Sequence, residues 1–219
     1  MTATTRLTPR AARRSFLPAA ARAAAVVSLA TALLGALQGC VAVVGGAAVG
    51  GAMMLSDRRS SGAQIEDESI ELKSGNKIKA AIGERGHVNV TSYNRVVLVT
   101  GEVPTDADKT AVIEALRTLE NVANVDDELI VGPSSTMSTR SSDTYITSKV
   151  KGAFVDAKDL QSNAIKVVTE RGNVYLMGRV TEREATRATE IARGTSGVMK
   201  VVRVFEILSE ADLASLQNK

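Results

Sequence analysis

The stretch Val88-Asn-Val-Thr-Ser-Tyr-Asn-Arg-Val-Val-Leu-Val-Thr-Gly-Glu-Val103 recurs, at a shift of 77, as Ile165-Lys-Val-Val-Thr-Glu-Arg-Gly-Asn-Val-Tyr-Leu-Met-Gly-Arg-Val180. In the second half of each copy, apolar residues alternate at the period of a half-buried strand. Turn-forming sequences separate the two halves, Tyr93-Asn94-Arg95 in the first copy and Arg171-Gly172-Asn173 in the second. Each copy therefore predicts a β-hairpin, and the repetition predicts two similar structural units.

A helix is predicted before each hairpin. Asn76-Lys-Ile-Lys-Ala-Ala-Ile82 matches Ser148-Lys-Val-Lys-Gly-Ala-Phe154 at a shift of 72, which assigns five extra residues to the second copy, within 155–164. Four residues of the second copy share one apolar helical stripe: Ile146, Val150, Ala153 and Phe154.

A second helix and a closing strand are predicted after each hairpin. Thr181 followed by Glu184 is a capping box at a helix start, and Thr105 followed by Asp108 is a weaker version of it. A valine-containing segment then repeats at a shift of 76. Each copy therefore runs helix, strand, strand, helix, strand.

The predicted class is α+β, with two tandem αββαβ domains, each a three-stranded mixed sheet with two helices on one face. The expected ranges are 1–39 for a signal peptide, 40–65 for a tether, 66–131 for the first domain, 132–142 for a linker, 143–208 for the second domain and 209–219 for a polar tail.

Gly101 and Gly178 occupy the same position of the second strand in the two copies. Glycine at such a buried position normally weakens a sheet, so its repetition needs a local cause. We expect a helix to cross there so closely that a Cβ atom would clash. The alternative is that these glycines admit a ligand.

The segment 1–39 has the features of a secretory signal: five arginines, no acidic residue and an apolar run that ends before Cys40. This leader resembles a bacterial lipoprotein signal, which implies cleavage before Cys40 and attachment of diacylglycerol and an acyl chain such as palmitate to its thiol. No other cofactor is expected. Val41 would be the second residue of the mature chain. In this the chain resembles lipoproteins that are anchored in the inner leaflet of the outer membrane and face the periplasm. The alternative is an uncleaved membrane-spanning helix, because residues 23–55 carry no charge.

The charge is unevenly distributed along the chain. The sequence pI is about 9.1, but residues 40–219 hold 22 basic and 24 acidic residues. The first domain, 66–131, has a net charge of −6, and residues 140–208, which include the second domain, have +4. Nucleic acid is therefore not an expected partner, and the six aromatic residues are too few for a stacking surface.

Catalysis is not expected, because no nucleophile with a base, metal cluster or phosphate loop is recognisable in the sequence. His87 is the only histidine and has no second ligand near it in the sequence. The acidic run Asp126-Asp127-Glu128 lacks the alternating oxygen ligands of a calcium loop. No metal site is predicted.

The order of these segments resembles the BON family (bacterial OsmY and nodulation domain), in which each unit is αββαβ with a glycine in the second strand. The resemblance covers residues 64–208 and is strongest in Asp143-Thr-Tyr-Ile-Thr-Ser-Lys-Val150 and Val180-Thr-Glu-Arg-Glu-Ala185. With the leader, the chain is similar to dual-BON outer-membrane lipoproteins. That resemblance implies binding to anionic phospholipid and a role in outer-membrane integrity, without catalysis.

The charge distribution favours the second domain for a membrane contact, at about 1 kcal/mol per basic residue near an anionic surface. The predicted contact residues lie opposite the apolar stripe of its first helix or in the loop after it: Tyr145, Ser148, Lys149, Lys151, Gly152, Val155 and Lys158. A tyrosine among lysines suits the headgroup region. At a shift of 72, Lys73 and Gly83 replace Tyr145 and Val155 in the first copy, so only one domain is expected to have this surface.

Two alternatives stay open at the level of sequence. The helix face could be an ordinary solvated surface with a packed tyrosine. The protein could instead be a scaffold that holds envelope or division proteins in the periplasm, with a docking surface on the first domain or in the groove between the domains. The oligomeric state has no sequence signal.

Overall fold

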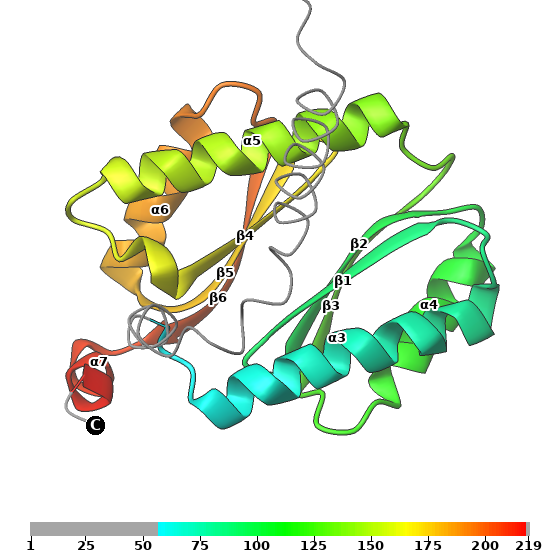
Figure 1. The fold of residues 1–219 in the computed structure, drawn as a ribbon, viewed down its shortest axis with the longest axis horizontal. Coiled ribbons are helices and arrows are strands. Elements are labelled where there is room, and N and C mark those ends of the chain that lie inside the picture. Colours follow the sequence, from blue (N-terminus) through cyan, green and yellow to red (C-terminus); the bar gives the residue numbers. More distant parts are fainter. Residues whose placement is uncertain (1–56, 218–219) are drawn as a thin grey trace, which may run out of the picture. The chain divides into compact units, whose positions relative to one another are not determined.

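The computed structural model of the chain describes residues 57–217, all of which belong to the same structural unit (Figure 1). The predicted signal peptide, Cys40 and the tether up to Ser56 lie outside the described residues. Within 57–217, no helix combines the length and the apolar character needed to cross a bilayer.

The first αββαβ unit has one helix before its β-hairpin and one after it. Its elements are α3 (Ser61–Ile82), β1 (His87–Tyr93), β2 (Val96–Val103), α4 (Asp106–Arg117) and β3 (Asn124–Val131). The central strand, β2, is antiparallel to β1 and parallel to β3. The sheet is therefore mixed, as predicted.

The second unit repeats this order. Its elements are α5 (Met137–Asp156), the short 3-10 helix η2 (Ser162–Ala164), β4 (Ile165–Glu170), β5 (Asn173–Thr181), α6 (Glu182–Gly194) and β6 (Lys200–Leu208), and α7 (Glu210–Gln217) follows. Strand β5 pairs antiparallel with β4 and parallel with β6. The predicted α+β fold of two αββαβ units is confirmed.

Helices extend into two segments that were expected to be connecting chain. Helix α5 begins at Met137, inside the range 132–142, and α3 begins at Ser61, inside the range 40–65. Both helices start at a side-chain cap, because Thr136 accepts the N–H of Thr139 and Ser60 accepts that of Ala63.

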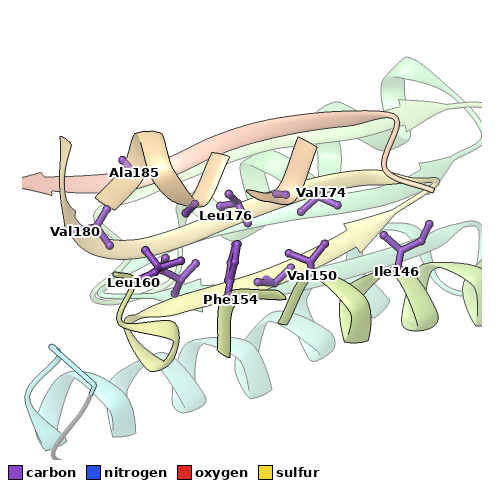
Figure 2. Packing of buried hydrophobic residues seen from close by; sticks show 12 residues of the cluster. Ile146, Val150, Phe154, Leu160, Val174, Leu176, Val180 and Ala185 are labelled. Atoms are coloured by element: carbon purple, nitrogen blue, oxygen red, sulfur yellow. The ribbon is translucent and has the colours of Figure 1, made fainter. Parts of the chain in front are cut away.

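Each unit has a core between its two helices and one face of its sheet. In the second unit, three residues of the predicted helical stripe, Ile146, Val150 and Phe154, are buried against Leu176 and other residues of β5 (Figure 2). The fourth, Ala153, is half-buried. The first unit has a matching core, to which Val97 and Val99 of β2 contribute. Alternate residues of β2 therefore face the helices.

Both hairpins turn where the sequence predicted. In the first, Asn94 and Arg95 have φ values of 50° and 69°. The carboxylate of Asp67 in α3 accepts their backbone N–H groups at 2.7 and 2.8 Å and the Ser92 hydroxyl at 2.7 Å. Burial opposes ionisation, but these hydrogen bonds hold the pKa of Asp67 below its usual range. A carboxylate on the helix therefore secures the left-handed turn.

The second hairpin uses an equivalent carboxylate. Asp143 of α5 accepts the backbone N–H groups of Arg171 and Gly172, both at 2.8 Å. Asp143 therefore corresponds to Asp67, which is a shift of 76 along the chain. The opening helices are related by this shift, and the shift of 72 predicted from sequence is wrong.

A second pair of contacts supports this register. Lys73 of α3 lies 4.0 Å from Glu120, and Lys149 of α5 donates to Ser196. The two lysines are related by a shift of 76, and so are their two partners. The second copy thus has one extra residue before its hairpin, not five. A difference of four residues is nearly one helical turn, so the apolar stripe alone does not distinguish the two registers.

The corrected register also changes the residues that correspond to the predicted membrane face. Ser69 corresponds to Tyr145, and Lys79 corresponds to Val155. The first domain therefore still lacks the tyrosine and the valine, although the counterparts named from sequence were wrong.

The two repeated glycines avoid a clash with neighbouring backbone, and the prediction of a crossing helix is wrong. A Cβ atom on Gly101, whose φ is +110°, would lie 2.0 Å from the carbonyl oxygen of His87 in β1. A Cβ on Gly178 would lie 2.4 Å from the carbonyl oxygen of Ala164, just before β4. Each glycine therefore allows the hairpin strands to approach each other closely.

Candidate membrane-contact site

The predicted contact residues are brought together on the outer side of α5 and in the loop that follows it. Tyr145 and Val155 are 66% and 69% exposed, although both have large apolar side chains. Lys151 and Gly152 lie exposed between them, and no heavy atom stands within 4 Å of a Cβ placed on Gly152. This face therefore presents apolar and cationic groups together to the outside.

The remaining predicted contact residues differ in their surroundings. The Lys149 ammonium lies 4.9 Å from the centroid of the Tyr145 ring and donates to the Ser196 hydroxyl at 2.7 Å. Lys149 thus orients the tyrosine by a cation–π contact. Ser148 is exposed, and its hydroxyl donates to a backbone carbonyl one turn earlier in α5. Lys158 is exposed in the loop after α5.

A groove of about 330 Å³ borders the end of this face. Lys151 and Val155 of α5 line it together with Asp57, Arg59 and Lys166. The α5 face is therefore continuous with a polar groove at the segment where the described chain begins.

The beginning of the described chain is bound by the second domain, which the sequence analysis did not predict. Arg58 is buried, and its guanidinium donates to both oxygens of Glu184 at 2.7 Å. It also donates to the Arg179 carbonyl at 2.8 Å and to the Gln161 side chain at 2.9 Å. Burial alone would raise the pKa of Glu184, but the hydrogen bonds from Arg58 and from the Thr181 N–H lower it.

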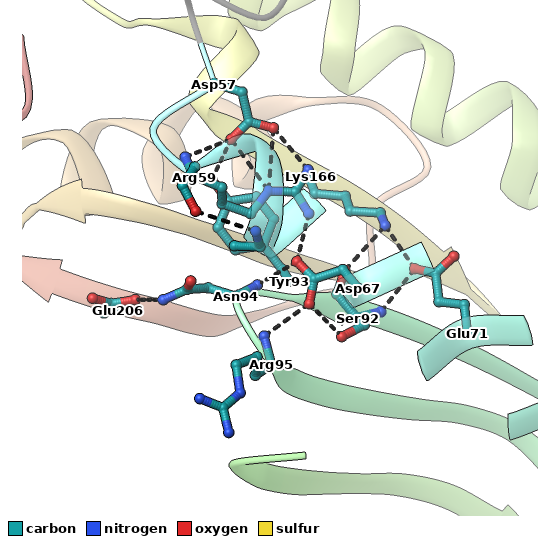
Figure 3. Close-up of polar contacts among 12 residues, drawn as sticks. Asp57, Arg59, Asp67, Glu71, Ser92, Tyr93, Asn94, Arg95, Lys166 and Glu206 are labelled. Atoms are coloured by element: carbon teal, nitrogen blue, oxygen red, sulfur yellow. Dashed lines mark hydrogen bonds and ion pairs between the residues drawn. The ribbon is translucent and has the colours of Figure 1, made fainter. Parts of the chain in front are cut away.

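Arg59 binds the first domain instead. Its guanidinium contacts Asp57 and Asp67, both at 2.7 Å, and lies 4.3 Å from the centroid of the Tyr93 ring (Figure 3). Burial raises the pKa of Tyr93 to about 12. Two consecutive arginines therefore hold the incoming chain against both domains.

The sheet faces that carry no helices pack against each other. Tyr93 and Leu98 of the first domain form a buried apolar cluster with Tyr175 and Met177 of the second. Tyr93 is the last residue of β1, whereas Leu98 in β2 and Tyr175 and Met177 in β5 alternate with residues that face the helices. Both sides of each central strand are consequently buried.

Polar contacts at the edge of this interface pair opposite charges. Lys166 of the second domain lies 2.9 Å from Glu71 of the first, and Arg171 donates to Glu102 (Figure 3 shows Lys166 and Glu71). Asn94 donates to Glu206 at 2.6 Å. The negative first domain and the positive second domain are thus partly matched to each other, so not all of the second domain's basic surface is available to a membrane.

Glu102 is fully buried at this interface. Burial would raise its pKa, but Arg171 and the Ser135 N–H hydrogen-bond the carboxylate and lower the pKa. Because Ser135 lies just before α5, this carboxylate also ties the connecting segment to β2.

Glu170 is the buried interface carboxylate with the opposite shift. Burial raises its pKa above the ordinary 4.5, the Glu102 and Asp143 charges raise it further, and the Asn89 hydrogen bond and His87 oppose the shift. Between pH 4.5 and the raised pKa the folded state holds the extra proton, so stability falls as the pH rises through this window.

Replacing Glu170 with Gln is therefore expected to stabilise the protein at neutral pH, because the amide carries no charge and still accepts from Asn89. The gain should vanish below about pH 4.5, where the wild-type carboxyl is protonated in both states. Urea unfolding from about pH 4 to about pH 8 measures this difference. An equal stability change at every pH would show that the charge of Glu170 is not responsible.

The residues considered for metal binding are engaged in other contacts. His87 Nε2 is 3.1 Å from the Asn89 amide nitrogen, and Asp127 contacts Lys109 and the Leu129 N–H. Among residues 57–217, no three His, Cys, Asp or Glu side chains are grouped as metal ligands.

The arrangement thus defines a class of protein: two repeated αββαβ domains packed sheet to sheet, with one outward helix carrying tyrosine, valine and lysine. The sequence model of the BON domain matches residues 66–133 and 142–209. The chain belongs to the BON domain family.

Three known proteins are similar over much of their length. The outer membrane lipoprotein DolP of Haemophilus influenzae is 42% identical, covering 80% of this chain and 94% of DolP. The 21 kDa hemolysin of Actinobacillus pleuropneumoniae is 31% identical, covering 68% of this chain and 78% of the hemolysin. The osmotically-inducible protein Y of Escherichia coli is 29% identical, covering 57% of this chain and 66% of that protein.

The interdomain residues were not predicted, although the sequence carries a signal for them. Val97-Leu98-Val99 and Val174-Tyr175-Leu176-Met177 are continuous apolar runs, which are typical of strands buried on both faces. Arg58 and Glu184 had no such signal, because they are far apart in the chain.

Proposed function

We propose that the protein is an outer-membrane lipoprotein, anchored through lipid on Cys40 and facing the periplasm, whose second BON domain binds anionic phospholipid and helps to maintain outer-membrane integrity. The observation that carries the proposal is the exposure of Tyr145 and Val155 beside lysines on α5. An aromatic ring and an aliphatic side chain can enter the headgroup region while ammonium groups meet phosphates. The similarity to DolP, which is named as an outer membrane lipoprotein, supports the anchor.

The lipid anchor and the α5 face would act together. A single helix face with a few lysines binds a membrane weakly, at about 1 kcal/mol per basic residue. Acylation of Cys40 would turn the second contact into an intramolecular event and raise its effective concentration. The protein would act by recognition and not by catalysis.

Co-sedimentation of residues 57–219 with liposomes tests the proposed binding to anionic phospholipid. We expect binding to vesicles that contain phosphatidylglycerol and little binding to neutral vesicles, with a strong salt dependence. Tyr145→Ala combined with Lys149→Glu and Lys151→Glu should lower the bound fraction at least tenfold, since it removes the ring and reverses two charges.

The matched control reverses two exposed lysines of α3, Lys77→Glu and Lys79→Glu, which makes the same charge change in the first domain. Equal loss in this control would show that net charge, not the α5 face, determines binding. Equal pelleting with neutral and anionic vesicles would reject the proposal. In cells, the α5 variant should fail to restore resistance to large antibiotics in a strain that lacks the protein.

A second candidate is a periplasmic scaffold for envelope or division proteins. It is favoured by Ile65 and Leu72, which lie two turns apart on α3 and are 69% and 77% exposed. Capture of an envelope protein that persists in the α5 variant and is lost in Ile65→Ser with Leu72→Ser would support this alternative.

A further inference from the structure

We propose that Arg58 is a positioning residue that fixes the end of the lipidated tether to the second domain, beside the α5 face. The inference rests on the proposed function, because it requires lipid on Cys40 and a membrane contact on α5. It adds the reason why the anchor presents that particular helix to the bilayer.

The partners of Arg58 all belong to the second domain, although Arg58 lies just before α3 of the first. Glu184 is in the first turn of α6, Arg179 is in β5 and Gln161 is in the loop after α5. The chain that arrives from the anchor is therefore bound by the second domain before it enters the first domain.

The carboxylate that binds Arg58 is also held by a contact that does not involve the arginine. Glu184 is the N3 residue of the α6 capping box, in which its side chain accepts the Thr181 N–H at 3.0 Å. The carboxylate is thus held in place, and the planar guanidinium matches its two oxygens. The corresponding carboxylate of the first domain, Asp108, pairs with Arg85, whose side chain is 64% exposed. Arg58 is therefore a buried partner of its helix cap, whereas the corresponding arginine of the first domain is an exposed one.

The segment that contains Arg58 lies beside the proposed membrane face of α5. Asp57 and Arg59, which flank Arg58, line the same groove as Lys151 and Val155 at the end of α5. Residues 41–56 span at most about 55 Å when fully extended. Because the tether is short, the place where it joins the fold decides which surface the anchor holds near the bilayer.

The test uses the acylated full-length protein in phosphatidylglycerol vesicles with a lipid-borne quencher. A fluorophore is attached to Asp156→Cys at the end of α5, and in a second sample to Glu114→Cys on α4. Cys40 is the only native cysteine, and in the acylated sample its thiol is blocked by lipid, so labelling is specific. In the test samples a flexible Gly/Ser segment of about twenty residues is inserted between Arg59 and Ser60, and Arg59, which itself binds Asp67 of the first domain, is replaced with Gln. These two changes separate the tether from the first domain, and the reference protein carries neither of them.

The compared variant is Arg58→Gln with Glu184→Gln, which removes the ion pair and leaves an amide that can still accept from Thr181. With Arg58 intact, the α5 probe should be quenched as strongly as in the protein without the insertion. In the double variant, the length of free chain between Cys40 and the folded domains more than doubles. The effective concentration of the membrane at α5 should therefore fall about fourfold, and the quenching of the α5 probe should fall with it. The α4 probe should be weakly quenched in both.

The outcomes separate the two proposals. Absence of quenching at the α5 probe in the protein without the insertion would reject the membrane contact itself. Strong quenching that is equal in the Arg58 form and in the double variant would keep the membrane contact and overturn the role of Arg58. Unfolding curves of both forms serve as the folding control.

Discussion

Replacing Arg58 with Gln is expected to lower the free energy of unfolding by about 3 kcal/mol or more, because Glu184 would remain buried without a cation. Glu184→Gln alone should cost a similar amount, since it leaves the Arg58 guanidinium buried beside a neutral amide. Urea unfolding of residues 57–219 measures both. The loss should be visible as a lower midpoint with an unchanged slope.

The double variant separates the ion pair from other effects. Arg58→Gln with Glu184→Gln leaves no buried charge, so its cost should be less than the sum of the two single costs by about 2 kcal/mol. The matched control is Arg85→Gln, which breaks the corresponding but exposed pair with Asp108 and should cost about 0.5 kcal/mol or less. Additive costs in the cycle would contradict a direct interaction between Arg58 and Glu184.

Replacing Gly101 with Ala should be the most damaging small substitution in the first domain, with an expected loss of about 3 kcal/mol or more. The new Cβ would lie 2.0 Å from the His87 carbonyl oxygen, and the φ of +110° is unfavourable for any residue with a side chain. Strand β1 would have to move away from β2, which would disturb the core on one side and the interdomain cluster on the other. Thermal and urea unfolding measure the loss.

Gly75→Ala is the matched control for this substitution. Gly75 is an exposed residue of α3, and a Cβ atom there would meet nothing within 4 Å. Because alanine is the better helix former, this change should raise stability by about 0.5–1 kcal/mol. A similar small effect at Gly101 would show that the strands can separate without cost.

The fold class followed from repetition and periodicity. The strand alternation around Gly101 and Gly178, and the turns at Asn94 and Arg171, were predicted correctly because these signals are local. The cause assigned to the glycines was wrong, because sequence shows where a glycine recurs and not which backbone approaches it. The register of the opening helices was wrong by four residues for a similar reason, since one turn of helix repeats the same apolar stripe.

The candidate site was only partly accessible from sequence. The exposure of Tyr145 and Val155 agrees with the helical stripe, because residues opposite Ile146 and Val150 must point away from the core. The sequence did not show that Lys149 is already engaged by Ser196. It also did not show that Lys166 and Arg171 are used within the interface, so the formal charge of +4 overstated what a membrane can meet.

Local periodicity and composition were enough to predict the two αββαβ units, their opposite net charges and the outward face of α5. The way in which the two units are joined depends on tertiary contacts that no local pattern predicts. The packing of Leu98 on the second sheet and the pairing of Arg58 with Glu184 connect residues far apart in the chain. Such contacts depend on which surfaces remain unburied after each domain has folded, and a single sequence carries no direct record of that choice.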